Sequence, residues 1–142
     1  MQKKYTLEDF NSFERNENGF IVCPAGDYTV IEQFPKKCSF GERCSFGERC
    51  SFGKECKCEQ KHEFKRLFLI GYIGSRDDTT QFWLLADNSI LVRCGCFCGS
   101  IDEFKTKVLQ THKDNHYAKE YLAAAVLAKL HFGYEEQGNA EK

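Results

Sequence analysis

The stretch Cys38–Lys61, CSFGERCSFGERCSFGKECKCEQK, contains three near-identical units of six residues and a fourth unit that has diverged. A period of six is too short for a repeat built of helices, which needs roughly 30 residues or more per unit. Periods this short are typical of solenoids in which each unit supplies one short strand and one corner. The sequence therefore predicts a β-solenoid in this stretch.

The six-residue spacing continues beyond the visible repeat in both directions. Nine successive positions at this spacing carry a large apolar residue or Cys: Val22, Tyr28, Phe34, Phe40, Phe46, Phe52, Cys58, Phe64 and Ile70. Such regularity predicts one inward column after another rather than an irregular loop. We therefore expect the solenoid to occupy residues 20–70, with residues 1–19 as an N-terminal segment that caps it.

Each unit reads F-G-E-R-C-S, which is similar to the hexapeptide signature of left-handed parallel β-helices. That resemblance implies that three hexads make one triangular coil, so that residues eighteen apart stack. It also implies that the small inward position of each unit is filled by Cys38, Cys44, Cys50 and Cys56. Phe is bulkier than the aliphatic residue usual in that fold, so a quadrilateral solenoid of the pentapeptide-repeat kind is an alternative, although those repeats step by five.

The chain contains nine cysteines, and we expect them to be free thiols. The N-terminal residues Met1–Lys4 lead directly into polar sequence, so no signal peptide is expected. A cytoplasmic protein keeps its cysteines reduced. Zinc sites bring together Cys pairs that are two to four residues apart, and a spacing of six does not do this. The repeat cysteines are therefore interpreted as small buried residues.

Charge and hydropathy exclude several functional classes. Twenty basic and twenty-one acidic residues leave a net charge of −1, which favours neither nucleic acid nor a membrane surface. Residues 67–74, LFLIGYIG, form the longest apolar run, well short of the roughly 20 residues that span a bilayer. In the repeat, Glu42 and Glu48 each precede an Arg, so the charges compensate. We expect no membrane association and no direct nucleic-acid binding.

The second half, residues 71–133, predicts a different structure. The runs 67–74, 81–86 and 90–94 are separated by polar turns and predict a three-stranded antiparallel β-meander. Two helices follow it, and the polar tail at 134–142 is expected to fray. The predicted fold is therefore mainly β with α: a short left-handed parallel β-helix, then a small antiparallel β-meander and two C-terminal α-helices that cap the solenoid.

Local signals define the ends of both helices. Ser100 and Glu103 form a capping box at the start of the first helix. Asp114 or Asn115 caps the second helix, and Gly133 ends it. The second helix is apolar around much of its surface, so its face from Tyr121 to Leu130 is predicted to pack on the sheet or on a second subunit.

The motif Cys94–Gly99, CGCFCG, is the most suggestive chemically. On an extended strand its three thiols would point to one side. Together with His112 or His116 they could then form a Cys₃His zinc site. The other interpretation is that they are small buried residues. We expect no cofactor, and the alternative is zinc held by Cys94, Cys96, Cys98 and His112.

Several segments resemble a group of uncharacterised proteins from phages and prophages of Gram-positive bacteria, which carry Cys-Ser-Phe-Gly-Glu hexads. The segments that carry the resemblance are IVCPAGDY (21–28), the hexads (38–55), IGSRDDTTQFW (73–83), RCGCFCGSIDEFKTKV (93–108) and HYAKEYLAAAVLAKLHF (116–132). The resemblance covers most of the chain. It implies an accessory protein that acts in the host bacterial cytoplasm against a defence system, as anti-CRISPR proteins do.

No catalytic constellation stands out in the sequence, so we expect a non-enzymatic binding or inhibitor protein that blocks a host protein or nucleoprotein complex. A homo-oligomer formed through the Tyr121–Leu130 helix face or through the end of the solenoid is a further expectation. The candidate contact residues are Glu42, Arg43, Glu48, Arg49, Arg76, Trp83, Arg93 and Lys105.

Two alternatives belong to other functional classes. The first is an enzyme similar to hexapeptide-repeat acyltransferases, which use a histidine base, and here His62, His112, His116 and His131 are the histidines present. The second is a protein that sequesters a small nucleotide signal, with Arg76, Arg93, Lys105 and Trp83 as contacts. The sequence contains no phosphate-binding Gly-rich loop to support the second alternative.

Overall fold

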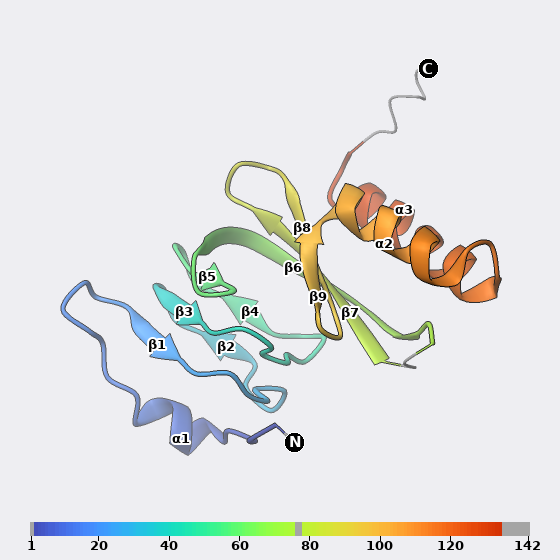
Figure 1. Ribbon diagram of the computed structural model, residues 1–142. Helices are drawn as coiled ribbons and strands as arrows, with labels where there is room; N and C mark the ends of the chain where they lie inside the picture. The colour runs from blue at the N-terminus through green and yellow to red at the C-terminus, as the bar shows by residue number, and fades with distance from the viewer. Residues whose placement is uncertain (1, 76–77, 135–142) are drawn as a thin grey trace. The chain divides into compact units, whose positions relative to one another are not determined.

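The computed structural model describes residues 2–75 and 78–134 (Figure 1). The chain divides into an N-terminal unit, Met1–Arg66 with Leu85–Asn88, and a C-terminal unit, Leu67–Leu84 with Ser89–Lys142. The predicted tail at 134–142 lies outside the described residues, apart from Tyr134. Arg76, one of the candidate contact residues, also lies outside them.

The fold is mainly β with two C-terminal helices. The strands are β1 (Ile21–Cys23), β2 (Gln33–Phe34), β3 (Cys38–Phe40), β4 (Ser51–Phe52), β5 (Lys57–Cys58), β6 (His62–Ile73), β7 (Asp78–Leu85), β8 (Ile90–Cys94) and β9 (Phe97–Ser100). The helices are α1 (Leu7–Asn11), α2 (Ile101–His112) and α3 (His116–His131). Seven strands form one mixed sheet in the order β1-β3-β5-β6-β7-β8-β9, and β2 pairs with β4 in a second sheet.

The predicted left-handed β-helix is wrong. Parallel pairing joins strands of two or three residues, together with isolated bridges at Lys4–Asp27 and Asp27–Ser45, and the last parallel strand pair ends at β5. Glu59 and Gln60 then adopt positive φ angles of 50° and 72°, and the chain reverses into β6, which runs antiparallel to β5. The antiparallel strands that follow belong to the same sheet, so the separate solenoid and meander are replaced by one mixed sheet.

The six-residue spacing did not distinguish a solenoid from a long strand, because six is a multiple of the two-residue period of a β-strand. Phe64 and Ile70 continue the count, but both lie in the twelve-residue strand β6. Residues six apart in a strand point to the same face, since side chains alternate with period two. At the other end of the count, Val22 is 57% exposed, whereas its neighbours Ile21 and Cys23 are buried.

Aromatic rings from the repeat form the core of the N-terminal unit. The ring of Phe40 makes edge-on contacts with Phe34 and Phe46, at centroid distances of 5.1 and 4.9 Å. Phe34 lies opposite Phe52 across the β2–β4 pair, and their rings stack at 5.2 Å. Each such pair contributes about 0.5–1.5 kcal/mol beyond the area it buries, so the aromatic cluster is a principal source of stability here.

Glycines let neighbouring segments of the repeat approach one another closely. A Cβ atom added at Gly53 would lie 2.5 Å from the backbone nitrogen of Lys36, and one added at Gly47 would lie 2.8 Å from the carbonyl oxygen of Thr29. No side chain fits at such distances. Gly47 and Gly53 are thus needed for close packing of main chain against main chain.

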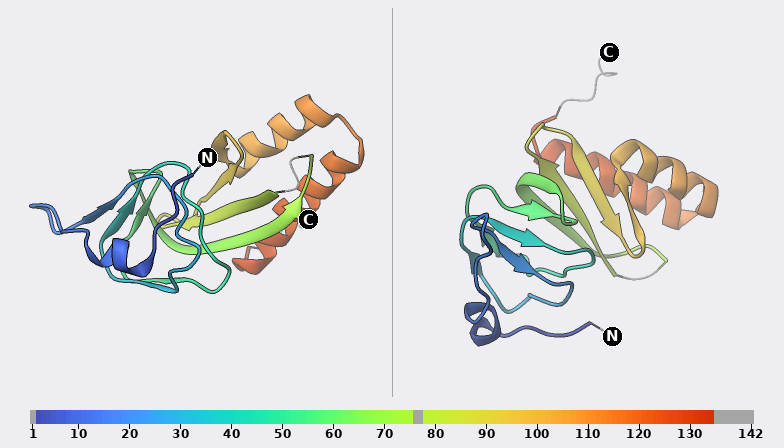
Figure 2. Two further views of the ribbon diagram at one scale, coloured as in Figure 1. Left: turned by 90° about the horizontal axis from the view of Figure 1, so that it is seen from below. Right: turned by 60° about the vertical axis from the view of Figure 1, so that its left-hand side comes forward.

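In the C-terminal unit, α2 and α3 cover one face of the sheet (Figure 2). Both helices begin, and α3 also ends, where the local signals predict. Ser100 and Glu103 form the capping box of α2, Asn115 caps α3, and Gly133 follows the end of α3 with a φ of 88°. The buried core residues of this unit are Phe82, Leu84, Ile90, Val92, Ile101, Phe104, Val108, Ala118, Tyr121, Ala124, Ala125 and Ala128.

Neither α2 nor α3, nor the short α1, is long and apolar enough to cross a bilayer, and this statement covers the helices of the described residues.

Candidate functional site

The motif CGCFCG forms a β-hairpin instead of one extended strand. Gly95 and Cys96 make a two-residue loop between β8 and β9, and Gly95 has a φ of 60°. Two-residue hairpin loops favour glycine where the first central residue needs a positive φ. The register across the hairpin pairs Cys94 with Phe97, and Arg93 with Cys98.

This register separates the three thiols. Cys94 lies on the helix-covered face, where it packs against the core with Phe97. Cys98 lies opposite Arg93, on the other face, because successive residues of a strand alternate. The shared side that the zinc alternative required is therefore absent from this hairpin. Within 2–75 and 78–134, no group of three Cys, His, Asp or Glu side chains could hold a metal ion.

His112, the fourth ligand of that alternative, has other neighbours. Its Nε2 atom lies 3.4 Å from the Ser75 hydroxyl, and its ring stacks on Tyr121 at a centroid distance of 5.7 Å. The Sγ atom of Cys94 accepts a hydrogen bond from the Thr80 hydroxyl at 3.6 Å. These contacts account for the two side chains as parts of the packed C-terminal unit.

β9 is the terminal strand of the seven-stranded sheet, and β8 is its one strand partner in the described part of the chain. An edge strand is a template to which a further strand can be added. Native proteins often protect such edges with Lys, Pro or a bulge. The sequence of β9, Phe97-Cys98-Gly99-Ser100, contains neither residue type.

The opposite end of the sheet is covered differently. β1 is bordered by the chain that precedes it, through an antiparallel bridge between Arg15 and Ile21. The backbone N–H of Asn16 also donates to the carbonyl of Phe20 at 2.8 Å. The two ends of the sheet thus differ: among the described residues no further strand pairs with the outer edge of β9.

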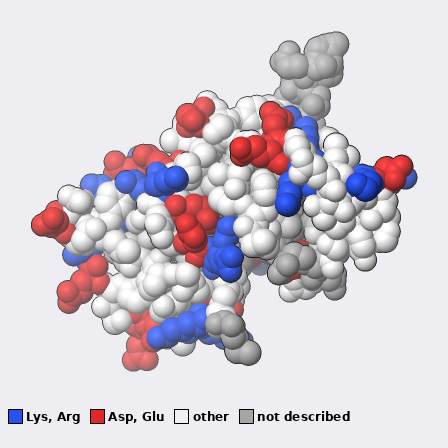
Figure 3. Space-filling view, viewed as in Figure 1, with Lys and Arg blue, Asp and Glu red and all other residues white. Residues whose placement is uncertain are grey.

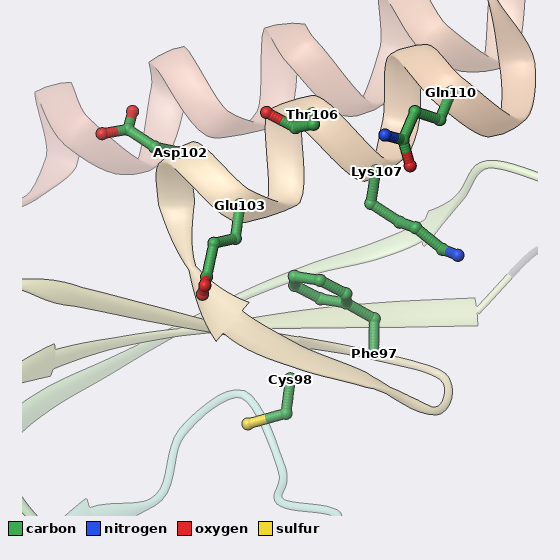
Figure 4. Close-up of a pocket in the computed structure, with 7 residues that line it drawn as sticks. All are labelled: Phe97, Cys98, Asp102, Glu103, Thr106, Lys107 and Gln110. Atoms are coloured by element: carbon green, nitrogen blue, oxygen red, sulfur yellow. The ribbon is translucent and has the colours of Figure 1, made fainter.

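A groove of about 450 Å³ lies between β9 and α2, and we call it the β9–α2 groove (Figure 4). α2 starts directly after β9 and packs on β8 and β9. The helix residues of the groove recur about one turn apart, so they form one side of α2. The lining residues are Phe97, Cys98, Asp102, Glu103, Thr106, Lys107 and Gln110.

The groove combines an aromatic floor with charges of both signs. The half-buried ring of Phe97 points toward α2 and contacts Phe104 at 5.7 Å, whereas Cys98 points away from the helix (Figure 4). The Phe97 ring lies between the carboxylate of Glu103 and the ammonium group of Lys107 (Figure 4). Glu103 is also held by the capping box, where its Oε1 accepts from the Ser100 N–H at 2.8 Å.

The candidate contact residues from the sequence lie elsewhere. Glu42 and Arg43 are exposed, and both line a hollow of about 520 Å³ in the N-terminal unit, together with Val22 and Gln60. Glu48 and Arg49 are exposed as well, but they do not line this hollow. The structure thus brings one of the two Glu-Arg pairs into a concave surface.

The remaining candidates lie in the C-terminal unit. Trp83 and Arg93 are buried. Trp83 pairs with Leu91, which is two residues from Arg93, so the side chains of Trp83 and Arg93 lie on the same face of the sheet. The Trp83 indole N–H donates to the Gln81 side-chain oxygen at 3.2 Å. Lys105 is half-buried on α2 and does not line the β9–α2 groove.

The repeat residues form the interior of the N-terminal unit. Tyr28, Phe34, Phe40, Phe46 and Phe64 are buried, and Phe52 is half-buried. The thiols of Cys38, Cys44 and Cys56 are buried too, while Cys50 is half-buried.

The repeat thiols resist ionisation. A hydrogen bond with Cys23 raises the pKa of Cys38 to about 12, and burial raises the pKa of Cys50 to about 11. A hydrogen bond with Cys38 is the main cause that raises the pKa of Cys56. Because the thiolate is the nucleophile and the metal ligand, thiols held in the protonated form are suited to packing.

The predicted oligomer face of α3 is divided by the structure. Tyr121 is only 4% exposed and belongs to the core, so it lies outside any surface. Val126, Leu127 and Leu130 are 42%, 49% and 59% exposed. An oligomer through this helix, which stays a prediction, would use these three side chains.

Sequence reasoning missed the β9–α2 groove because it did not recognise β9. Of the groove residues, it named Cys98 as a zinc ligand and Glu103 as a cap. The available signal was Gly95, since a glycine between two alternating runs is typical of a tight hairpin.

The chain matches no family model, no curated protein and no solved structure.

Proposed function

We propose that the protein is a non-enzymatic binding protein that holds an extended segment of a partner protein against β9, in the β9–α2 groove. The observation that carries this proposal is the coincidence of two features at one place. β9 is the terminal strand of the sheet, and a groove lined by one side of α2 runs beside it. An edge strand next to a helix is an arrangement suited to strand addition.

In strand addition, the main chain of the bound segment provides affinity and its side chains provide selectivity. The main chain of the bound segment pairs with the outward-facing main-chain groups of β9 whatever its sequence, except at the Ser100 N–H, which already donates to Glu103. Each hydrogen bond contributes about 0.5–1.5 kcal/mol net. Every second side chain then points to the same face. Those side chains would meet Phe97 and the exposed residues of α2, so the groove can select among sequences.

The other functional classes receive less support. The acyltransferase alternative depended on left-handed coils, and the mixed sheet removes that basis. The nucleotide alternative depended partly on Trp83 and Arg93, which are buried. Acidic and basic side chains lie intermixed on the face seen in Figure 3, a pattern that suits a protein partner better than nucleic acid.

The identity of the partner follows from the phage resemblance alone. On that basis we propose a host protein or nucleoprotein complex of a bacterial defence system, met in the cytoplasm. Binding would block the host protein if that protein needs the bound segment free for its own activity.

The experiment is a selection of random peptides on the immobilised full-length protein, with retained peptides measured by fluorescence anisotropy. A groove-filling variant, Thr106→Trp, should abolish binding, because Thr106 is exposed and lines the groove. The matched control is Thr111→Trp, which alters an exposed residue of the same helix outside the groove. Equal binding by both variants would place the site elsewhere.

A second measurement tests the mode of binding. N-methylation removes one backbone N–H of a peptide without changing its side chains. In an added strand, only alternate N–H groups face the neighbouring strand. Binding should therefore fall at every second methylated position and persist at those between. Loss at all positions, or at none, would contradict strand addition.

A further inference from the structure

We infer that α3 carries a second interaction surface, at which two copies of the protein pair antiparallel about a two-fold axis. The surface consists of four exposed side chains, Ala123, Val126, Leu127 and Leu130, and we call it the α3 patch. This inference goes beyond the proposed function and does not depend on it, because the β9–α2 groove is lined by residues of β9 and α2.

The α3 patch is the outward side of a helix that is apolar on both sides. The inward side is buried in the core, through Ala118, Tyr121, Ala125 and Ala128. At about 3.6 residues per turn, the four residues of the patch lie on the opposite side of the helix. A helix that is apolar all round is normally covered all round. A partner is therefore expected to cover the α3 patch.

A second copy fits the patch because the patch is complementary to itself. Its members lie at i, i+3, i+4 and i+7, so they form one continuous surface centred between Val126 and Leu127. A two-fold axis through that centre places Val126 against Leu127 of the second copy. It also places Ala123 against Leu130 of the second copy. The small side chain of Ala123 leaves room for the branched end of that leucine, so the two helices can approach closely.

The charge beside the patch also suits an antiparallel pair. Lys119, one turn before Ala123, is exposed and lies in the first turn of α3, which contains no acidic residue. A positive charge is unfavourable at the N-terminus of its own helix and favourable at a C-terminus. In the antiparallel pair, Lys119 lies toward the C-terminal end of α3 in the second copy, where the helix dipole attracts it.

Other occupants fit the patch less well. A helix that lies on a membrane surface carries a face rich in Lys or Arg opposite its apolar face. The side of α3 opposite the patch is instead buried in the core. Residues 135–142, EEQGNAEK, offer no large apolar side chain to cover the patch.

The size of the patch sets the expected affinity. The 16 residues of α3 span about 24 Å, so one pair of such helices buries less than a standard interface of about 800 Å² per partner. The dimer should therefore be reversible, with a dissociation constant on the order of micromolar. It presents two β9–α2 grooves, so a partner with two suitable segments can bind both at once.

Sedimentation equilibrium of the full-length protein tests the pairing, at concentrations from about 5 to 500 μM around the expected constant. Leu130→Glu places a charge in the interface twice and should raise the dissociation constant at least about tenfold. The matched control is Leu109→Glu, since Leu109 on α2 is 50% exposed and Leu130 is 59% exposed. A wild type that stays monomeric throughout, or equal weakening by both variants, would overturn the inference.

An exchange of side chains tests the two-fold arrangement. Ala123→Leu crowds Leu130 of the second copy, and Leu130→Ala leaves a gap, so each change alone should weaken the dimer. The double variant has one small and one large side chain at each such contact, and it should dimerise about fivefold more tightly than either single variant. The two positions lie about 10.5 Å apart along one helix, so recovery cannot arise within one copy. The control, Ala123→Leu with Leu127→Ala, should show no recovery. A double variant as weak as the single ones would overturn the antiparallel two-fold pairing.

Discussion

Cys94 and Cys98 lie four residues apart and project from opposite faces of the sheet. Cys94 pairs with Phe97 and packs with it against the helices, whereas Cys98 pairs with Arg93 on the other face. The cause is the two-residue loop at Gly95 and Cys96, which turns the motif into a hairpin. The hairpin makes β9 the terminal strand of the sheet.

Thiol reactivity should distinguish the exposed cysteines from the buried ones. Cys96 and Cys98 are exposed, so they should react with iodoacetamide at neutral pH. Cys23, Cys38 and Cys56 are buried and should react only after unfolding. Peptide mass mapping after brief alkylation gives the order directly. Early modification of the buried group, in protein that remains folded, would contradict the packing role of the repeat thiols.

Stability should fall in alkaline solution. The pKa of Cys50 is raised to about 11 in the fold, so the fold favours its protonated form. In the unfolded chain the thiol ionises near its ordinary pKa, so the stabilisation is complete below that value and is lost as pH rises through the folded pKa. Denaturant unfolding between about pH 9 and 11 should show the decline.

Cys50→Ala should flatten part of that decline, because it removes one titrating thiol. Cys38, with a pKa of about 12, continues to contribute in the variant. A matched control is Cys96→Ala, which changes an exposed thiol in the loop of the β8–β9 hairpin. An identical pH profile for wild type and Cys50→Ala would show that this thiol does not ionise differently in the two states.

The parts of the fold that depend on local signals could be predicted. The start of α2 and both ends of α3 follow from Ser100 with Glu103, from Asn115 and from Gly133, all within one turn of the boundary they set. The strands at 67–74, 81–86 and 90–94 overlap β6, β7 and β8 for the same reason. Polar turns and alternating side chains are sufficient to locate them.

The sheet and the candidate site could not be predicted in the same way. A spacing of six fits both a coil of hexads and a long strand, so Phe64 and Ile70 could not distinguish the two. The reversal at Glu59 and Gln60 needs positive φ in residues that rarely adopt it. Whether a strand lies at the edge depends on the strand order of the whole sheet, so the sequence of β9 alone does not predict it.

Phe40 and Val22 provide a direct test of which repeat positions form the core. Phe40 is 1% exposed and touches several rings, so Phe40→Ala should reduce the free energy of unfolding by about 3–5 kcal/mol. Val22, assigned to the same inward column by the six-residue count, is 57% exposed. Val22→Ala should change stability by less than about 0.5 kcal/mol. Comparable losses of unfolding free energy in the two variants would indicate that Val22 and Phe40 both face the core, as the six-residue count predicted.

Gly95 should control both the hairpin and peptide binding. Its φ of 60° is costly for residues with a Cβ, most of all for β-branched ones. Gly95→Val should therefore destabilise the hairpin more than Gly95→Asn, since Asn tolerates positive φ better. Amide hydrogen exchange in β9 measures the hairpin, and anisotropy with a selected peptide measures the groove. Both the protection of the β9 amides and the affinity for the peptide should be lower in Gly95→Asn than in the wild type, and lower still in Gly95→Val. A variant whose β9 amides lose protection while peptide affinity is unchanged would separate the binding site from the edge strand.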